Sequence, residues 1–106
     1  MVMEWQTTIP DCEGYERIGL RGDCDLYDAP KFARAILERI ESGEGALHLD
    51  FSGVAYLDSS GVGAIVKIVQ AARRVGSKVR FSGIRGSPRR VLELSNILPL
   101  LVETDV

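Results

Sequence analysis

Two amphipathic helix patterns alternate with short apolar strand patterns in this chain, and the alternation restricts its fold more than any other feature. The pattern at residues 30–42 collects its apolar side chains on one face, namely Phe32, Ala33, Ile36, Leu37 and Ile40. The pattern at residues 60–75 does the same with Val62, Ile65, Val66, Val69 and Ala72. Residues 45–51 lie between the two helices and alternate as a half-buried strand. Because each helix has one apolar face to bury, both are expected on the same side of one sheet.

Four further strands are predicted around these segments. They cover residues 5–9, 15–21, 78–82 and 100–103, and turns rich in Gly, Pro and Asp separate them. A loop is predicted over residues 52–58, before the second helix. The resulting order is β-β-α-β-α-β-α-β. It predicts an α/β fold with a mixed sheet, right-handed crossovers and helices packed mainly on one face.

Capping residues mark where the helices begin and end. Asp28 is the expected N-cap of the first helix, and Gly43 follows its last turn. Ser87 is the expected N-cap of a third helix, and Asn96 stands where a left-handed residue is favoured after it. The apolar side of this third helix is predicted to be Val91, Leu92 and Leu94.

Length and composition are those of one small domain. The chain has 106 residues, of which 45% are hydrophobic, and a net charge of −2. We therefore expect residues 1–106 to form a single folded domain. The sequence shows no signal-peptide pattern and no apolar run near the ~18 residues of a membrane span. A cytoplasmic domain without a membrane partner is expected.

The charges are distributed unevenly along the chain. Residues 59–92 hold eight basic side chains and no acidic one. The eight are Lys67, Arg73, Arg74, Lys78, Arg80, Arg85, Arg89 and Arg90. Because Phe81 is the only aromatic residue in this segment, nucleic acid is not the predicted partner. Ordinary surface ion pairs or a protein partner are predicted instead.

The numbers of thiols and imidazoles exclude several kinds of active site. Cys12 and Cys24 are the only cysteines and His48 is the only histidine, so a zinc site with four Cys or His ligands cannot form. Both thiols are expected to be reduced. His48 falls inside a strand pattern, where a structural histidine is expected rather than a mobile catalytic base. We predict no catalytic residue, no metal and no cofactor.

Residues 57–63 form the junction between a strand and the second helix. Ser59 and Ser60 stand at the helix N-terminus, where backbone N–H groups and the helix dipole favour a negative group such as a phosphate. Either serine can cap the helix and leave the other hydroxyl free. Gly61 and Gly63 occupy the first turn, where each costs about 1 kcal/mol relative to alanine. Either this helix packs very closely on its own sheet, or another molecule approaches its backbone.

The enzyme motifs built on similar residues do not fit this junction. A nucleophile elbow requires glycine where Leu57 stands, and a dinucleotide-binding fingerprint requires a small residue where Val66 stands. The carboxylates of Asp23, Asp25 and Asp28 lack the spacing of a calcium loop. The junction therefore indicates a domain that binds a partner or is itself modified.

The hexapeptide at residues 58–63, Asp-Ser-Ser-Gly-Val-Gly, resembles the Asp-Ser-Ser/Thr-Gly-aliphatic-Gly signature of the STAS domain family of bacterial anti-sigma factor antagonists. Upstream, residues 22–25 and the following Ala-Pro pair are similar to that family's Gly-acidic-aliphatic-Asp element and the helix after it. Residues 91–97 are similar to its terminal helix. The resemblance spans nearly the whole chain. The departures are Cys24 at an aliphatic position and Asn96 where the family often has glycine.

The resemblance implies a single STAS-like domain that acts in a partner switch. The unphosphorylated form would bind an anti-sigma factor, an ATP-binding serine kinase with a histidine-kinase-like fold, and so release the sigma factor. Phosphorylation at Ser59 would abolish that binding, and a serine phosphatase would restore it. The implied partner-binding residues are Asp23, Asp25, Asp58, Ser60, Gly61 and Gly63. The loop at residues 23–27 is expected beside the N-terminus of the second helix, and the domain is expected to be a monomer.

Three other functions compete with this one. The first is a STAS module without a kinase, either a scaffold or a lipid-transport accessory. Such relatives often lack the serine that this chain keeps at Ser59. The second is a serine hydrolase with Ser59 as nucleophile and His48 as base. The third is a nucleotide-binding module in which Gly61, Gly63 and nearby arginines hold phosphates.

Overall fold

Four strands form one mixed sheet in this protein. The computed structural model describes residues 3–7, 13–43 and 45–104. The strands are β1 (Glu4–Thr7), β2 (Tyr15–Cys24), β3 (Ala46–Leu57) and β4 (Val79–Ser82), and they lie side by side in the order β1-β2-β3-β4. The edge strand β1 pairs antiparallel with β2, whereas the β2–β3 and β3–β4 pairs are parallel.

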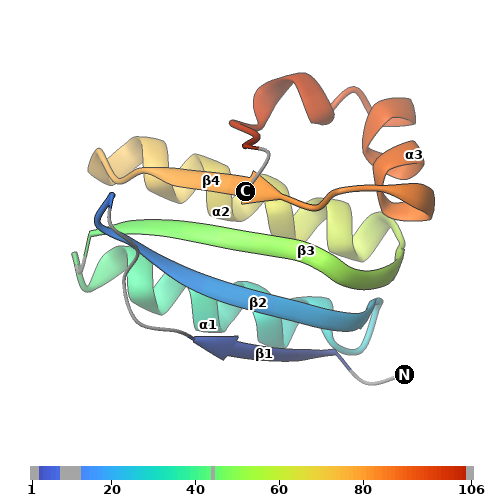
Figure 1. Cartoon of the computed structure of the whole chain (residues 1–106), viewed down its shortest axis with the longest axis horizontal. Coiled ribbons are helices and arrows are strands. Elements are labelled where there is room, and N and C mark those ends of the chain that lie inside the picture. The colour runs from blue at the N-terminus through green and yellow to red at the C-terminus, as the bar shows by residue number, and fades with distance from the viewer. Residues whose placement is uncertain (1–2, 8–12, 44, 105–106) are drawn as a thin grey trace.

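The two long helices cover one face of this sheet. Helix α1 (Ala29–Glu41) connects β2 to β3, helix α2 (Ser59–Val75) connects β3 to β4, and the two pack against each other (Figure 1). The shorter α3 (Gly86–Leu94) follows β4 and contacts β3. The opposite face of the sheet, which we call the open face, carries no helix of the described chain (Figure 1). The predicted mixed α/β architecture with helices mainly on one face is confirmed.

A row of aromatic rings joins the sheet to the helices. Phe32 of α1 lies 6.3 Å from Trp5 and 6.3 Å from Phe51 of β3, measured between ring centroids. Phe51 in turn lies 5.9 Å from Phe81 of β4. The three phenylalanines are fully buried. Side chains from three strands and one helix therefore form one continuous core.

The predicted loop at residues 52–58 is wrong, because β3 continues to Leu57. Its last residues pair with the end of β2, where Cys24 lies opposite Leu57. The Ser52–Gly53 pair resembles a turn in sequence, but Gly53 is needed inside the sheet. A Cβ atom at Gly53 would lie 2.7 Å from the carbonyl oxygen of Leu20. The close approach of β2, rather than a turn, explains this glycine.

The predicted strand at residues 100–103 is present only as an isolated bridge. The chain first forms a 3-10 turn, η1 (Leu98–Leu100), in which the fixed φ angle of Pro99 suits a helical turn. Glu103 then bridges to Phe81. The backbone N–H of Phe81 donates to Val102 and its carbonyl accepts from Thr104, each at 2.8 Å. The sheet therefore has four strands and a short C-terminal attachment at β4.

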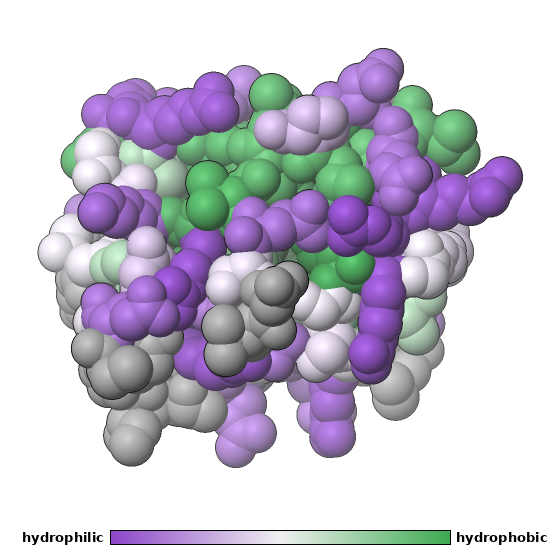
Figure 2. Space-filling view, turned by 45° about the horizontal axis from the view of Figure 1, so that its top comes forward, coloured by the Kyte–Doolittle hydropathy of each residue, from purple (hydrophilic) through white to green (hydrophobic). Residues whose placement is uncertain are grey.

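The apolar face of α2 is rotated from the prediction. The helix buries Gly61, Ala64, Ile65, Ile68, Ala71 and Ala72. Three residues of the predicted face are only half-buried, namely Val62, Val66 and Val69. The small residues of α2 face the sheet and α1, because α1 and α2 pack closely there. The valines therefore lie on the side of the molecule that carries β4, where Val69 is found. Figure 2 shows a contiguous hydrophobic area on that side, bordered by hydrophilic residues.

Two predicted caps and one predicted core residue are also corrected. Asp28 stands at the N-cap of α1, but its side chain makes no capping hydrogen bond. It accepts instead from the backbone N–H of Met3 at 3.3 Å. Helix α3 begins at Gly86, one residue before the predicted cap Ser87, and its Leu94 is 74% exposed. Asn96 adopts the predicted left-handed conformation, with φ of 58°.

Candidate functional site

Asp58 organises the N-terminus of α2. Its Oδ1 accepts hydrogen bonds from the backbone N–H groups of Ser60 at 2.9 Å and Gly61 at 3.2 Å. Its Oδ2 accepts a third from Leu26, in the loop between β2 and α1, at 3.2 Å. One carboxylate therefore caps the helix and holds the neighbouring loop beside it. This contact confirms the predicted position of the loop at residues 23–27.

That loop is shaped by a second aspartate. The Oδ1 of Asp25 accepts from the N–H groups of Tyr27 and Asp28, each at 3.0 Å, and its carbonyl accepts from Ala29 at 2.8 Å. Asp25 thus performs the helix-starting role that the sequence assigned to Asp28. Asp23 lies at the end of β2, opposite Tyr56 of β3. The structure therefore brings Asp23, Asp25 and Asp58 to one end of the sheet.

The structure distinguishes the two serines, which their spacing in the sequence does not. Ser59 is exposed, and within the described residues its hydroxyl has no hydrogen-bond partner. Ser60 is half-buried and lines a hollow between α1 and α2 together with Pro30 and Ala33. Neither serine caps the helix, because Asp58 does so. The Ser59 Oγ is therefore the hydroxyl that another protein can reach.

The two glycines of the first turn have different roles. Gly61 is buried, and a Cβ atom there would lie 2.3 Å from Leu57 Cδ1 and 2.7 Å from the backbone oxygen of Cys24. A Cβ atom at Gly63 would meet nothing within 4 Å. Gly61 therefore allows α2 to pack on its own sheet. Gly63 has no such explanation and leaves open space beside Ser59.

Three large apolar side chains surround this end of the molecule. Leu26 is 64% exposed, Tyr27 is 78% exposed and Tyr56 is 46% exposed. The sequence analysis did not select them. A usable signal was present, because two large apolar residues stand between Asp25 and Asp28 in a loop that has no core of its own. We call this region the Ser59 surface and define it by Asp23, Asp25, Leu26, Tyr27, Tyr56, Asp58, Ser59 and Gly63.

Cys24 lies directly beneath the Ser59 surface. Its side chain is fully buried and its thiol is free. Burial raises the pKa of this thiol to about 12, and the charges of Asp58, Asp25 and Asp28 add to the effect. Cys24 is therefore a protonated packing residue at neutral pH. Cys12 lies outside the described residues.

His48 cannot serve Ser59 as a base. It is fully buried in β3, nine residues before the end of that strand, which corresponds to about 30 Å. Its Nδ1 accepts from Arg80 Nε at 2.9 Å, and its Nε2 lies 2.7 Å from Ser82 Oγ. Both ring nitrogens are engaged within the core. The prediction of a structural histidine is confirmed, and the arrangement does not support the serine hydrolase.

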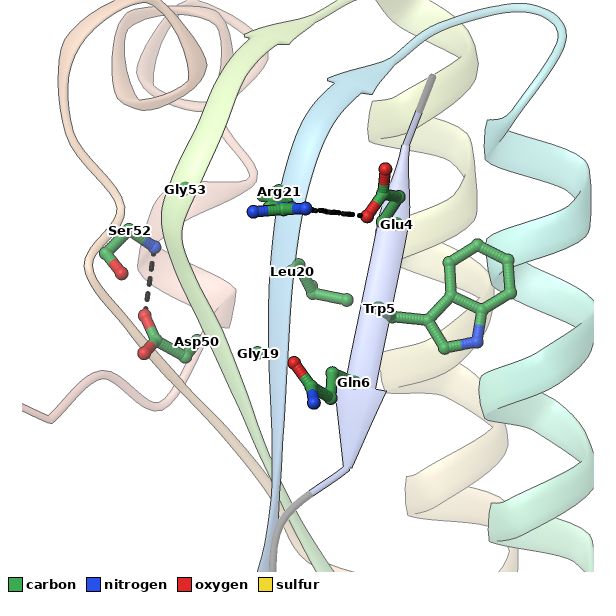
Figure 3. Close-up of a pocket in the computed structure, with 9 residues that line it drawn as sticks. All are labelled: Glu4, Trp5, Gln6, Gly19, Leu20, Arg21, Asp50, Ser52 and Gly53. Atoms are coloured by element: carbon green, nitrogen blue, oxygen red, sulfur yellow. Dashed lines mark hydrogen bonds and ion pairs between the residues drawn. The ribbon is translucent and has the colours of Figure 1, made fainter. Parts of the chain in front are cut away.

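A separate hollow of about 350 Å³ lies on the open face, away from Ser59 (Figure 3). Gly19 and Gly53 leave it open, and the Glu4–Arg21 ion pair of 2.9 Å forms one side. Although burial raises the pKa of Asp50, hydrogen bonds from Ser52 and Arg17 outweigh this and hold that pKa below its ordinary value. The lining of this hollow contains no cysteine or histidine. We assign no chemistry to the hollow.

Metal-binding clusters and membrane-spanning helices are both absent from residues 3–7, 13–43 and 45–104. Within these ranges, no three His, Cys, Asp or Glu side chains come together as metal ligands. None of the helices in the same ranges has the length and hydrophobicity needed to cross a bilayer.

Comparison with known proteins agrees with this geometry. The family model of the STAS domain matches residues 10–105. The chain belongs to the STAS domain family. This STAS domain is 31% identical over 85 residues to the anti-sigma-B factor antagonist of Listeria monocytogenes. The aligned residues cover 79% of this chain and 74% of the relative.

Solved structures of STAS domains show the same fold. The anti-sigma factor antagonist SpoIIAA in its unphosphorylated form matches with a TM-score of 0.77 and 20% identity, over 95% of this chain and 88% of that chain. The Bacillus cell fate determinant SpoIIAA in its phosphorylated form matches with a TM-score of 0.71 and 20% identity, over 95% and 91% of the two chains. The relatives are named anti-sigma factor antagonists, which are regulatory proteins rather than enzymes.

Proposed function

We propose that this STAS domain is an anti-sigma factor antagonist whose binding to an anti-sigma factor is ended by phosphorylation of Ser59. The supporting observation is the exposed Ser59 hydroxyl, unengaged within the described chain, on a helix end that Asp58 holds in place. The exposed Leu26, Tyr27 and Tyr56 around it provide apolar area for a protein interface.

The proposed partner is a serine kinase that binds ATP and has a histidine-kinase-like fold. In the reaction, Ser59 Oγ forms a bond to the γ-phosphorus of ATP, the bond to the bridging oxygen breaks, and ADP leaves. The hydroxyl proton passes to a base of the kinase. A serine phosphatase reverses the modification by hydrolysis. We place the switch in the cytoplasm and expect a monomeric domain.

Charge alone can drive the release. A phosphoserine carries about −1.5 to −2 charges at neutral pH. The N–H groups of Ser60 and Gly61, which would otherwise attract it, already bind Asp58. The phosphate would therefore face Asp58 and an apolar partner surface. A hundredfold loss of affinity needs about 2.7 kcal/mol, and burying an unpaired dianion costs several kcal/mol.

The test uses the purified domain, the anti-sigma factor kinase of the same organism and ATP, with mass spectrometry as the readout. We expect one phosphate on Ser59. Ser59→Ala should bind the kinase constitutively and accept no phosphate, and Ser59→Asp should bind poorly. Ser60→Ala is the matched control and should still be phosphorylated. Phosphate on Ser60 with Ser59 unmodified would refute the assignment.

The nucleotide-binding and scaffold alternatives receive less support. Gly61 is occupied by packing against Leu57, so it cannot cradle a phosphate. Arg85 and Arg89 are engaged elsewhere, with Ser52 and Glu103. Incubation with labelled GTP and ATP in the absence of a kinase tests the nucleotide-binding alternative directly. A wild-type domain that binds its partner equally well before and after phosphorylation would identify a scaffold.

A further inference from the structure

A groove lies along the outer edge of β4, on the side of the molecule that shows the hydrophobic area in Figure 2. It has a volume of about 280 Å³. Its apolar lining is Val69, Ala72, Val79, Phe81, Leu100 and Val102. Leu100 is 47% exposed and Val102 is 65% exposed. We call this feature the β4 groove.

The backbone of β4 is only partly paired along this groove. Leu47 of β3 donates to the carbonyl of Lys78, so the parallel ladder directs the N–H and C=O groups of Val79 and Phe81 to the outer edge. Phe81 satisfies both of its groups with Val102 and Thr104. Within the described residues, no hydrogen bond occupies the outward N–H and C=O of Val79. The C-terminal segment runs parallel to β4 and begins to pair only at Val102, after η1, so it lies beside Phe81 and not beside Val79.

Three cations beside the groove have no ion-pair partner among the described residues. Of the basic residues between 59 and 92, Arg80 pairs with Glu13 at 3.2 Å and Arg89 pairs with Glu103 at 2.9 Å. Arg73, Arg74 and Lys78 are exposed, and no carboxylate of the described chain pairs with them. Arg73 and Lys78 line the groove itself. Arg73, Arg74 and Lys78 therefore form a patch of unpaired positive charge beside the groove.

We propose that the β4 groove is the docking site for an extended, acidic segment of a partner protein, which pairs with β4 at Val79 and continues the line of residues 102–104. Strand alternation sets the chemistry of that segment. Val79 points towards the helix layer, as Phe81 does, whereas Lys78 points towards the open face. The segment would therefore alternate apolar residues, inserted beside Val79, with Asp or Glu facing Lys78.

This site is separate from the Ser59 surface. Ser59 begins α2, whereas Val69, Ala72 and Arg73 of the groove lie ten to fourteen residues later, so the two sites are about 15–21 Å apart along the helix axis. One end of the domain carries Asp23, Asp25 and Asp58, and the other carries Arg73, Arg74 and Lys78. A partner bound in the β4 groove leaves Ser59 accessible. A negative result for the β4 groove would therefore leave the phosphorylation of Ser59 untouched, and the reverse also holds.

A peptide-display library of random twelve-residue peptides, selected on the immobilised whole domain, tests the proposal. We expect enrichment of peptides that alternate Val, Ile or Leu with Asp or Glu. When one such peptide is titrated into the ¹⁵N-labelled domain, the amide of Val79 and those of residues 100–102 should shift, whereas those of residues 58–63 should not. The double variant Arg73→Glu/Lys78→Glu should weaken binding at least tenfold. Lys31→Glu, an exposed charge reversal on α1, should leave it unchanged.

Three results would overturn the proposal. The first is enrichment of basic peptides or of no peptide class. The second is a set of shifted amides that excludes Val79, or an affinity that Arg73→Glu/Lys78→Glu leaves unchanged. The third is a dimer in analytical ultracentrifugation that Leu100→Asp dissociates, because that result would assign the groove to a second copy of the chain. Circular dichroism of each variant verifies that loss of binding does not reflect unfolding.

Discussion

The carboxylate of Asp58 joins the backbone of Leu26 to the first turn of α2. The Oδ2–N distance to Leu26 is 3.2 Å, and Oδ1 accepts from Ser60 and Gly61. Asp58, the residue before the candidate phosphoacceptor, therefore holds the loop at Leu26 and the start of α2 together. Because Asp58 caps the helix, the serine at position 59 is left free at a helix N-terminus, where serine is often the cap itself.

Replacement of Asp58 by alanine should destabilise the domain by about 1–2 kcal/mol, because a helix cap is lost. The same change should accelerate hydrogen exchange at the amides of Leu26, Ser60 and Gly61, which lose their acceptor. Urea denaturation and exchange measured by NMR provide the two readouts.

Ser59→Ala is the matched control for this variant, because its hydroxyl makes no hydrogen bond in the described chain. It should change the free energy of unfolding by less than about 0.5 kcal/mol. Equal destabilisation by the two variants would contradict the assignment of Asp58 as the cap.

The two glycines of α2 should respond to alanine in opposite ways. Gly61→Ala places a Cβ atom against Leu57 and a backbone oxygen of Cys24, so we expect a loss of about 1–3 kcal/mol. Gly63→Ala adds a methyl group in open space and removes a flexible residue from a helix. It should stabilise the domain by about 0.5–1 kcal/mol.

The affinity for the anti-sigma factor distinguishes a glycine needed for packing inside the domain from a glycine that contacts the partner. Gly63→Ala should weaken the complex with the anti-sigma factor although the domain becomes more stable. The sequence left close packing and approach by a partner open for both glycines, and the structure assigns packing to Gly61. If Gly61→Ala left the melting temperature unchanged, the packing explanation would be wrong.

The sequence predicted the order of elements as far as α3, because local signals and burial agree there. Gly43 and Gly76 end α1 and α2 in the left-handed conformation, with φ of 73° at each. The Asp-Ser-Ser-Gly signature located the junction at Ser59. The length of β3 could not be predicted, because the reason for Gly53 is the approach of β2, which only tertiary contacts reveal.

The face of α2 and the choice between Ser59 and Ser60 also depended on tertiary contacts. Ala64 and Ala71 are buried where α1 packs against α2, whereas the larger Val69 is only half-buried and lines the β4 groove. A hydrophobicity pattern weights valine above alanine and therefore predicts the opposite. Ser59 and Ser60 are chemically identical, and only the direction of each side chain distinguishes them.

The tautomer of His48 follows from its partners. An arginine Nε can only donate, so the Nδ1 that it contacts at 2.9 Å must accept, and the ring proton of neutral His48 lies on Nε2, facing Ser82. Long-range ¹H–¹⁵N NMR should show the Nε2–H tautomer. Arg80→Met should destabilise the domain by about 1–3 kcal/mol, because the buried acceptor on His48 loses this donor.

Arg89→Met is the control for Arg80→Met. The Arg89 side chain is 40% exposed in its ion pair with Glu103, so its loss should destabilise the domain much less than the loss of Arg80. Observation of the Nδ1–H tautomer, or equal losses for the two variants, would refute this description of the His48–Arg80 pair.

Cys24 should make stability depend on alkaline pH. Burial, with the charges of Asp58, Asp25 and Asp28, raises its pKa from 9.0 to about 12 in the folded domain. Between about pH 9 and pH 12 the unfolded chain has lost the thiol proton and the folded chain retains it. The unfolded state then binds fewer protons than the folded state, so the free energy of unfolding falls as pH rises.

In a Cys12→Ser background, we expect the free energy of unfolding of the protein with Cys24 to fall between pH 8 and pH 10.5 by about 2 kcal/mol more than that of the Cys24→Ala variant. Urea denaturation at the two pH values measures the difference, and parallel losses in the two proteins would show that the buried thiol ionises as readily as a free one.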